Sequence, residues 1–208
     1  MATPSLIPSD EFTTLRARAR SVLTVRGSRF LAEAVPVNGK EACEAVLAAI
    51  RKEYFDATHH CYAYRLGADG AQGRAGDDGE PSGTAGKPIL GAIESAGLTD
   101  VIVVVTRYFG GTKLGTGGLV RAYRQAAEGA LASGARLTLH VLDILDLSIP
   151  HECVGPVMRA VAAAGGKIVR SDYSDRVSMG IEIRRSRTVA LRSALLEATA
   201  GAARFSGR

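Results

Sequence analysis

A continuous run of β-branched residues, VIVVV at Val101–Val105, is the feature that most constrains the fold of this 208-residue chain. The run lacks the alternation of apolar and polar residues shown by a strand with one solvated face, and it is typical of a fully buried strand. The segment TRYFGGTKLGTGGLVRAY (residues 106–123) follows directly and passes into apolar residues at helical spacing. The sequence therefore predicts a buried strand that turns through glycines into a helix.

The glycine-rich turn carries arginine and lysine but no acidic residue between residues 106 and 124. Unpaired N–H groups at a helix N-terminus favour anions, and glycines let a phosphate approach the backbone closely. The residues expected to bind an anion or the RNA backbone are Arg107, Lys113, Gly115, Thr116, Gly117, Gly118 and Arg121. The glycine spacing matches neither the P-loop nor the dinucleotide fingerprint, so a purely structural turn remains the alternative.

A second glycine-rich loop, RAGDDGEPSGTAGKP at residues 74–88, carries Asp77, Asp78 and Glu80. Carboxylates in this arrangement can bind a divalent cation or act as a general base. The alternative interpretation is a solvated loop that starts the next helix, with Ser82 or Thr84 as the N-cap and the acidic residues favouring the helix dipole. This loop is a possible acidic site, and the sequence does not decide between the two interpretations.

The strand-like segment ATHHCYAYRL places His59 and Cys61 on one face and His60 on the other. Histidine and cysteine two residues apart can bind zinc or form a nucleophile–base pair. A structural zinc site needs four ligands, however, and no second pair occurs at suitable spacing. Cys61 is therefore expected to be a core residue, and neither a metal nor another cofactor is expected.

Composition places the chain among ordinary globular proteins, with 46% hydrophobic and 23% charged residues and a net charge of +5. The mild positive charge permits contact with RNA without requiring it. Three cysteines far apart argue against a disulfide framework, and no apolar run reaches the ~18 residues that a membrane span needs. We therefore expect a soluble, cytoplasmic protein.

The pattern of elements predicts an α+β protein of two domains, 1–135 and 136–208. The glycine at VRGS (residues 25–28) predicts a tight hairpin within the first domain. The second domain reads as strand, helix, strand, strand and helix, with a short last strand possible, which is the order of a ferredoxin-like βαββα(β) sandwich.

Four segments, in order SRFLAEAVPV, DATHHCYAYRL, DDGEPSGTAGKPIL and VIVVVTRYFGGTKLGTGGLVRAY, resemble the IMPACT family and its bacterial YigZ-like branch. The resemblance runs from about Leu15 to Ser133, and the chain after Arg136 resembles the ferredoxin-like C-terminal domain of bacterial members. It implies a two-layer α/β sandwich for the N-terminal domain, of the type found in a small-subunit ribosomal protein and in domain IV of elongation factor G. The C-terminal domain is similar to domain V of that factor.

The resemblance implies a translation-related regulatory factor that binds RNA, the ribosome or a translation-associated protein. Eukaryotic members restrain a kinase that phosphorylates an initiation factor, and they use an additional N-terminal domain that we do not expect in this chain. No catalytic residue is carried over from the family, so we expect a non-enzymatic protein. Two alternatives stay open: a protein-interaction module without nucleic acid, and an enzyme acting on a phosphorylated or nucleotide substrate between the two glycine-rich loops.

Overall fold

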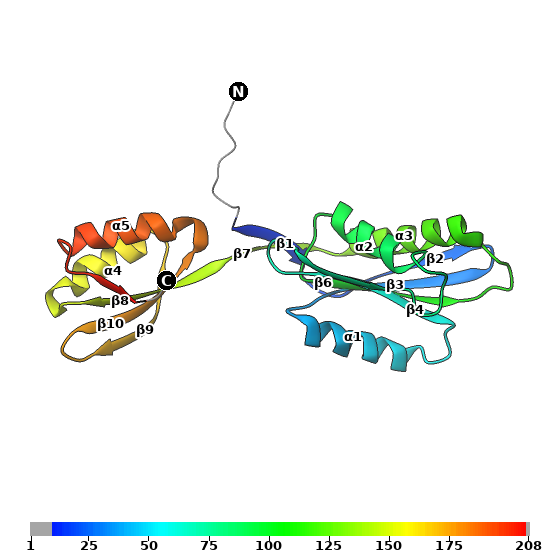
Figure 1. The fold of residues 1–208 in the computed structure, drawn as a ribbon, viewed down its shortest axis with the longest axis horizontal. Coiled ribbons are helices and arrows are strands. Elements are labelled where there is room, and N and C mark those ends of the chain that lie inside the picture. Colours follow the sequence, from blue (N-terminus) through cyan, green and yellow to red (C-terminus); the bar gives the residue numbers. More distant parts are fainter. Residues whose placement is uncertain (1–9, 207–208) are drawn as a thin grey trace, which may run out of the picture. The chain divides into compact units, whose positions relative to one another are not determined.

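The computed structural model describes residues 10–206, which form two compact units (Figure 1). The N-terminal unit comprises residues 12–139, and the C-terminal unit comprises residues 140–206 together with Asp10 and Glu11. The chain divides after Leu139 rather than after residue 135, because β7 (Arg136–His140) pairs with β1 (Glu11–Leu15). The predicted outer limits, residues 1 and 208, lie outside the described residues.

The N-terminal unit is built on a five-stranded antiparallel sheet with the order β2-β3-β6-β4-β5. The strands are β2 (Ala19–Val25), β3 (Ser28–Pro36), β6 (Val101–Tyr108), β4 (His59–Leu66) and β5 (Gln72–Gly76). Seven of the eight residues of the central strand β6 are buried, which confirms the prediction from VIVVV. The hairpin predicted at VRGS joins β2 to β3, with Val25 opposite Ser28.

Helices cover both faces of this sheet (Figure 1). On one face, α1 (Lys40–Glu53) packs over Ile102 and Val104 of β6. On the other, α2 (Gly86–Ser95) and α3 (Gly115–Ser133) pack over Val103 and Val105. The unit therefore has three layers, one more than the predicted two-layer sandwich, because the apolar run of β6 buries both of its faces.

The C-terminal unit has the element order β8, α4, β9, β10, α5, β11 and an antiparallel sheet ordered β11-β8-β10-β9. Its elements are β8 (Leu142–Ile149), α4 (Val154–Ala163), β9 (Lys167–Tyr173), β10 (Val177–Arg184), α5 (Thr188–Ala198) and β11 (Arg204–Ser206). Both helices pack against the sheet over one core, to which Leu147, Ile181 and Leu191 contribute. Across residues 10–206, no helix has the length and apolar character that a membrane span requires.

Candidate functional site

The candidate site lies where β6 ends and the chain turns towards α3. Phe30, Arg107 and His59 are register partners on β3, β6 and β4, so their side chains form one row on the same sheet face. This is the face that α2 and α3 cover. Tyr123 of α3 packs edge-to-face on Phe30, with ring centroids 5.2 Å apart.

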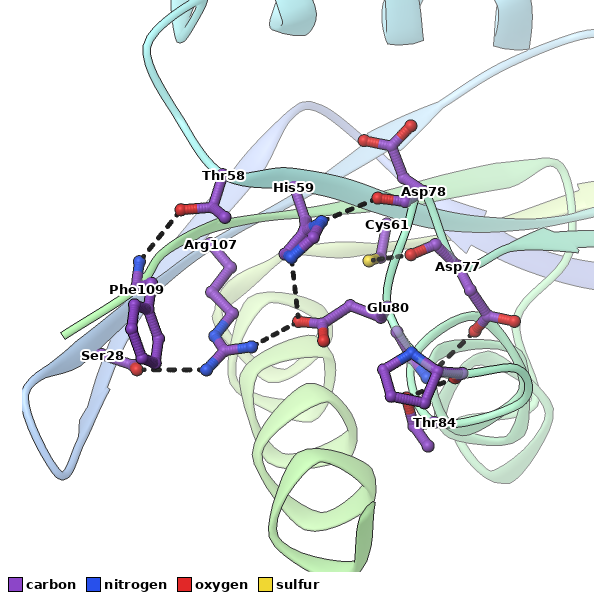
Figure 2. A network of polar contacts seen from close by, with 12 residues as sticks. Ser28, Thr58, His59, Cys61, Asp77, Asp78, Glu80, Thr84, Arg107 and Phe109 are labelled. Atoms are coloured by element: carbon purple, nitrogen blue, oxygen red, sulfur yellow. Dashed lines mark hydrogen bonds and ion pairs between the residues drawn. The ribbon is translucent and has the colours of Figure 1, made fainter. Parts of the chain in front are cut away.

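A buried ion pair joins Arg107 of β6 to Glu80 of the acidic glycine-rich loop (Figure 2). Arg107 Nη1 donates to Glu80 Oε1 over 2.6 Å, and the two side chains are only 6% and 4% exposed. Tyr123 donates its hydroxyl proton to the same oxygen over 2.7 Å. Burial raises the pKa of Tyr123 well above its usual value, so this hydroxyl remains a donor at neutral pH.

The position of Arg107 differs from the one that the anion-site prediction requires. Its guanidinium lies between two aromatic rings, 5.5 Å from the centroids of both Phe30 and Phe109. Its charge is neutralised by Glu80, because its place on β6 turns the side chain under α3 rather than towards solvent. Arg107 therefore helps to hold the site together, and the exposed positive charge comes from other residues.

Asp77 caps the start of α2. Its carboxylate accepts hydrogen bonds from the backbone N–H groups of Gly83, Ala85 and Gly86, at 2.8, 3.1 and 2.8 Å. Burial acts to raise the pKa of Asp77, but these three hydrogen bonds outweigh it and hold the pKa below its usual value. The predicted N-cap at Ser82 or Thr84 is wrong, since Ala85 precedes the helix and the Thr84 hydroxyl donates to Pro81 O instead.

The three acidic residues of this loop point towards different partners (Figure 2). Asp78 accepts from Arg51 Nη2 over 2.6 Å and from the backbone N–H of His60 over 2.7 Å, while Asp77 faces α2 and Glu80 faces Arg107. Within residues 10–206, no group of three or more His, Cys, Asp or Glu side chains is arranged to hold a metal ion. The loop thus uses its carboxylates one by one, to cap a helix and to pair with two arginines.

His59 and Cys61 share one face of β4, as the sequence indicated, but their surroundings differ. His59 Nδ1 lies 2.8 Å from Asp78 O, and His59 Nε2 lies 3.9 Å from Glu80 Oε1. Cys61 is fully buried, and its thiol contacts Asp77 O over 3.0 Å. Burial raises the pKa of Cys61 to about 12, so the thiol stays protonated at neutral pH, unlike a catalytic nucleophile.

A cavity of about 420 Å³ opens beside the ion pair. Its lining combines both glycine-rich loops with the row on the sheet: Thr58, His59, Glu80, Pro81, Arg107, Phe109, Lys113, Leu114, Gly115, Thr116 and Leu119. Glu80, Arg107 and Leu119 are buried, whereas Phe109, Lys113 and Thr116 are exposed. The predicted residues Lys113, Gly115 and Thr116 thus line one cavity together with the predicted acidic residue Glu80.

A second cavity of about 210 Å³ lies on the other side of Leu114, which lines both. Gly118 and Arg121 of the predicted set contribute to it, and so does Arg26 from the β2–β3 turn. Gly117 lies in the first turn of α3 between the two groups. The predicted anion-binding residues are therefore distributed around the start of α3 and do not line a single cavity.

The start of α3 is open to a ligand. No side chain caps it, and its first turn contains no acidic residue. A Cβ placed on Gly115, which has φ of +71°, meets nothing within 4 Å, so the backbone at this point is not covered by other parts of the unit. Such a helix terminus presents unpaired N–H groups and a partial positive charge.

Gly110 fixes the glycine-rich turn against the β2–β3 hairpin. A Cβ on Gly110 lies 1.9 Å from the carbonyl carbon of Gly27, so the two backbones approach more closely than any side chain allows. The hydroxyl of Ser28 accepts from the Gly110 N–H over 3.2 Å and from Arg107 Nη2 over 3.3 Å. This contact brings Arg26, at the hairpin tip, next to the α3 terminus.

Two contributions to the site were not identified from sequence. Arg26 reads only as part of a hairpin turn, and nothing local indicates that it lies beside Arg121. Tyr123 reads as an apolar position of a helix, although it also donates a hydrogen bond to Glu80. The available signal was the alternative of a substrate bound between the two glycine-rich loops, since residues of both loops line one cavity.

Comparison with known proteins identifies relatives along most of the chain. The model of the Impact N-terminal domain matches residues 26–131. The IMPACT family member YigZ of Escherichia coli is 36% identical over 161 residues, covering 76% of this chain and 79% of that protein. The IMPACT family member YvyE of Bacillus subtilis is 30% identical over 190 residues, covering 91% and 88%.

A crystal structure of a hypothetical protein is 31% identical and superposes with a TM-score of 0.72, covering 96% of this chain and 98% of that one. A match of this extent includes both units of the fold and agrees with the sequence relatives. The chain belongs to the IMPACT family, in its YigZ-like branch.

Proposed function

We propose that this protein is a translation-related regulatory factor that binds RNA at the start of α3. The contact surface, called here the α3 cationic surface, consists of Arg26, Lys113, Arg121 and the first turn of α3. All residues of this surface belong to the N-terminal unit.

The observation that carries this proposal is the unpaired state of three exposed cations beside a helix N-terminus. Arg26, Lys113 and Arg121 form no hydrogen bond or ion pair through their side chains with any of residues 10–206. In contrast, Arg20 is paired with Glu33, as many other arginines of this unit are paired. Cations that the protein does not neutralise, next to free N–H groups, are available for phosphate oxygens.

The fold adds a supporting analogy. In the C-terminal unit, the βαββαβ order and the sheet order β11-β8-β10-β9 support the expected split βαβ, ferredoxin-like sandwich. The family resemblance relates this sandwich to domain V of elongation factor G. For the N-terminal unit, the relation to a ribosomal protein and to domain IV of that factor rests on the family resemblance. These comparisons favour a ribosomal RNA or a ribosome-associated component in the cytoplasm as partner, on analogy of fold alone.

Salt-dependent RNA binding tests the proposal directly. The affinity for a single-stranded RNA is measured by fluorescence anisotropy over a range of salt concentrations, for the protein and for the variant Arg26→Glu/Lys113→Glu/Arg121→Glu. Because each phosphate contact contributes about 0.7 to the slope of log K against log salt for single strands, the slope is expected to fall by about 2.

The matched control is Arg16→Glu/Lys52→Glu/Arg136→Glu, which changes the net charge equally at exposed residues that line neither cavity. The proposal requires that this control retain the slope of the unmodified protein. Equal slopes for all three proteins, or equal losses in both variants, would show that the α3 cationic surface does not bind the RNA. Recovery of a partner from lysate that resists RNase would support a protein ligand instead.

A further inference from the structure

The cavity beside the Arg107–Glu80 pair contains polar groups that do not contribute to the binding of a phosphate. In the proposed function, phosphates bind to Lys113 and the start of α3, whereas the buried carboxylate of Glu80 repels an anion. An apolar cavity of about 420 Å³ with a few converging polar groups has the size and character of a small-molecule site.

Glu80 has one occupied and one unoccupied oxygen. Oε1 accepts from both Arg107 Nη1 and the Tyr123 hydroxyl, and these two bonds hold the carboxylate in place. Oε2 has no hydrogen-bond partner among residues 10–206, and it is not fully enclosed by protein. The carboxylate of Glu80 is only 4% exposed, so its unpaired oxygen is a strong hydrogen-bond acceptor that can bind a donor group of a ligand.

His59 provides a second acceptor at the same place. The carbonyl oxygen of Asp78 can only accept, so the His59 Nδ1–H donates to it. In the singly protonated ring, His59 Nε2 is the acceptor nitrogen; it lies 3.9 Å from Glu80 Oε1 and lines the cavity (Figure 2). Two acceptors next to each other match an amino group, which offers two N–H donors.

The remaining walls suit a flat, apolar ring. Phe109 is 48% exposed and lines the cavity, as do Pro81, Leu114 and Leu119. Aromatic side chains exposed beside a basic surface are the usual stacking platforms for unstacked bases of single strands. The same cavity is bounded by Lys113 and Thr116, so a stacked ring and its phosphate can be held together.

We propose that this cavity binds one unstacked nucleobase that carries an exocyclic amino group, with the phosphate of the same nucleotide at Lys113 and the start of α3. The inference rests on the RNA binding proposed above and adds a base preference to it. Glu80 Oε2 and His59 Nε2 accept from the amino group, and the ring lies against Phe109. Uracil presents a carbonyl oxygen where cytosine has its amino group, so it places an acceptor against two acceptors and binds more weakly.

The test compares cytosine with uracil, which have the same ring size. Oligo(C) and oligo(U) of equal length are titrated by fluorescence anisotropy, and CMP and UMP by calorimetry. Oligo(C) is expected to bind about tenfold more tightly, the effect of one hydrogen bond to a charged group. A preference in the mononucleotides as well identifies a free nucleotide as a sufficient ligand, and a preference confined to the oligomers identifies RNA; either result supports the base site.

Two variants separate base recognition from folding. His59→Asn retains a donor near the position of Nδ1 and removes the Nε2 acceptor, and it is expected to abolish the preference for cytosine. Phe109→Ala changes an exposed side chain and is expected to weaken both oligomers about tenfold through lost stacking, with the preference retained. Circular dichroism and a thermal melt establish that each variant is folded.

The outcomes distinguish this inference from the proposed function. Equal binding of oligo(C) and oligo(U), with the salt dependence intact, would overturn the base site and leave RNA binding at the α3 cationic surface standing. A cytosine preference that survives His59→Asn in a folded variant would also overturn it. Absence of binding to either oligomer at low salt, with no difference between CMP and UMP, would overturn both the proposed function and the base site.

Discussion

Replacing Arg107 with methionine removes the charge that faces Glu80 while filling most of the same volume. The magnitude of the effect follows from burial, since the two side chains are 6% and 4% exposed and their atoms lie 2.6 Å apart. Removing one partner of such a pair leaves an uncompensated buried charge, so the free energy of unfolding of the N-terminal unit is expected to fall by about 3 to 5 kcal/mol.

The double variant Glu80→Gln/Arg107→Met removes both charges and keeps an acceptor for the Tyr123 hydroxyl. It is expected to be more stable than Arg107→Met by about 2 kcal/mol, because the destabilisation of a lone buried carboxylate disappears. The control is the exposed pair Arg124–Glu128, with 48% of each side chain exposed, where Arg124→Met is expected to cost less than about 0.5 kcal/mol.

Urea unfolding followed by near-ultraviolet circular dichroism measures these differences. Five of the six tyrosines, all except Tyr173, lie in the N-terminal unit, so the tyrosine signal reports mainly its transition. Two results would refute the reasoning: a loss below about 1 kcal/mol for Arg107→Met, or a double variant whose loss equals the sum of the losses measured for Arg107→Met and for Glu80→Gln alone.

Three further predictions concern the same unit. Asp77→Ala is expected to lower the free energy of unfolding by about 1 to 2 kcal/mol through loss of the α2 cap. Because the pKa of Asp77 is lowered in the folded state, the stabilisation by its carboxylate is complete above pH of about 4 and is lost as the pH falls further. The difference in free energy of unfolding between the protein and Asp77→Ala should therefore become smaller in acid, and a difference that does not change with pH would contradict this prediction. Gly110→Ala is expected to lower the free energy of unfolding by about 3 kcal/mol, because its Cβ would overlap the backbone of the hairpin. Gly111→Ala places its Cβ in open space at φ of +83° and should lower the free energy of unfolding by about 1 kcal/mol. The reverse order in chemical denaturation would exclude this explanation. Cys61 and Cys43, with pKa values raised by burial to about 12 and about 11, should not react with a thiol reagent at pH 8 until the unit unfolds, and rapid labelling of either in the folded protein would refute their burial.

The sequence predicts the elements of this protein better than the contacts between them. The β-branched run indicated a buried strand, and the glycine at Gly27 indicated a hairpin, because both signals are local. The sequence did not indicate that α1 covers the second face of the sheet, because the apolar face of that helix can pack against any apolar surface. Layers depend on which surfaces meet, and periodicity alone does not contain that information.

The candidate site shows the same limit in its charged residues. Arg107 belongs to a cation-rich segment and was assigned to an external anion, although its strand position turns it towards Glu80, 27 residues away in the chain. Asp77 caps a helix that starts nine residues later, because the intervening loop folds back on itself. In both cases the conformation of a loop determines which group the side chain contacts, and local sequence patterns do not predict that conformation.

The alternation of β6 between two cores has a consequence for hydrogen exchange. Neighbouring residues such as Val103 and Val104 belong to different hydrophobic clusters, and the strand is hydrogen-bonded on both sides, to β3 and β4. Its amide protons can therefore exchange only when the strand separates from β3 or β4, and that separation disrupts the cores on both faces of the sheet. They should be the last to exchange in the N-terminal unit, at a rate set by its global unfolding, while those of the outer strand β5 exchange through local opening.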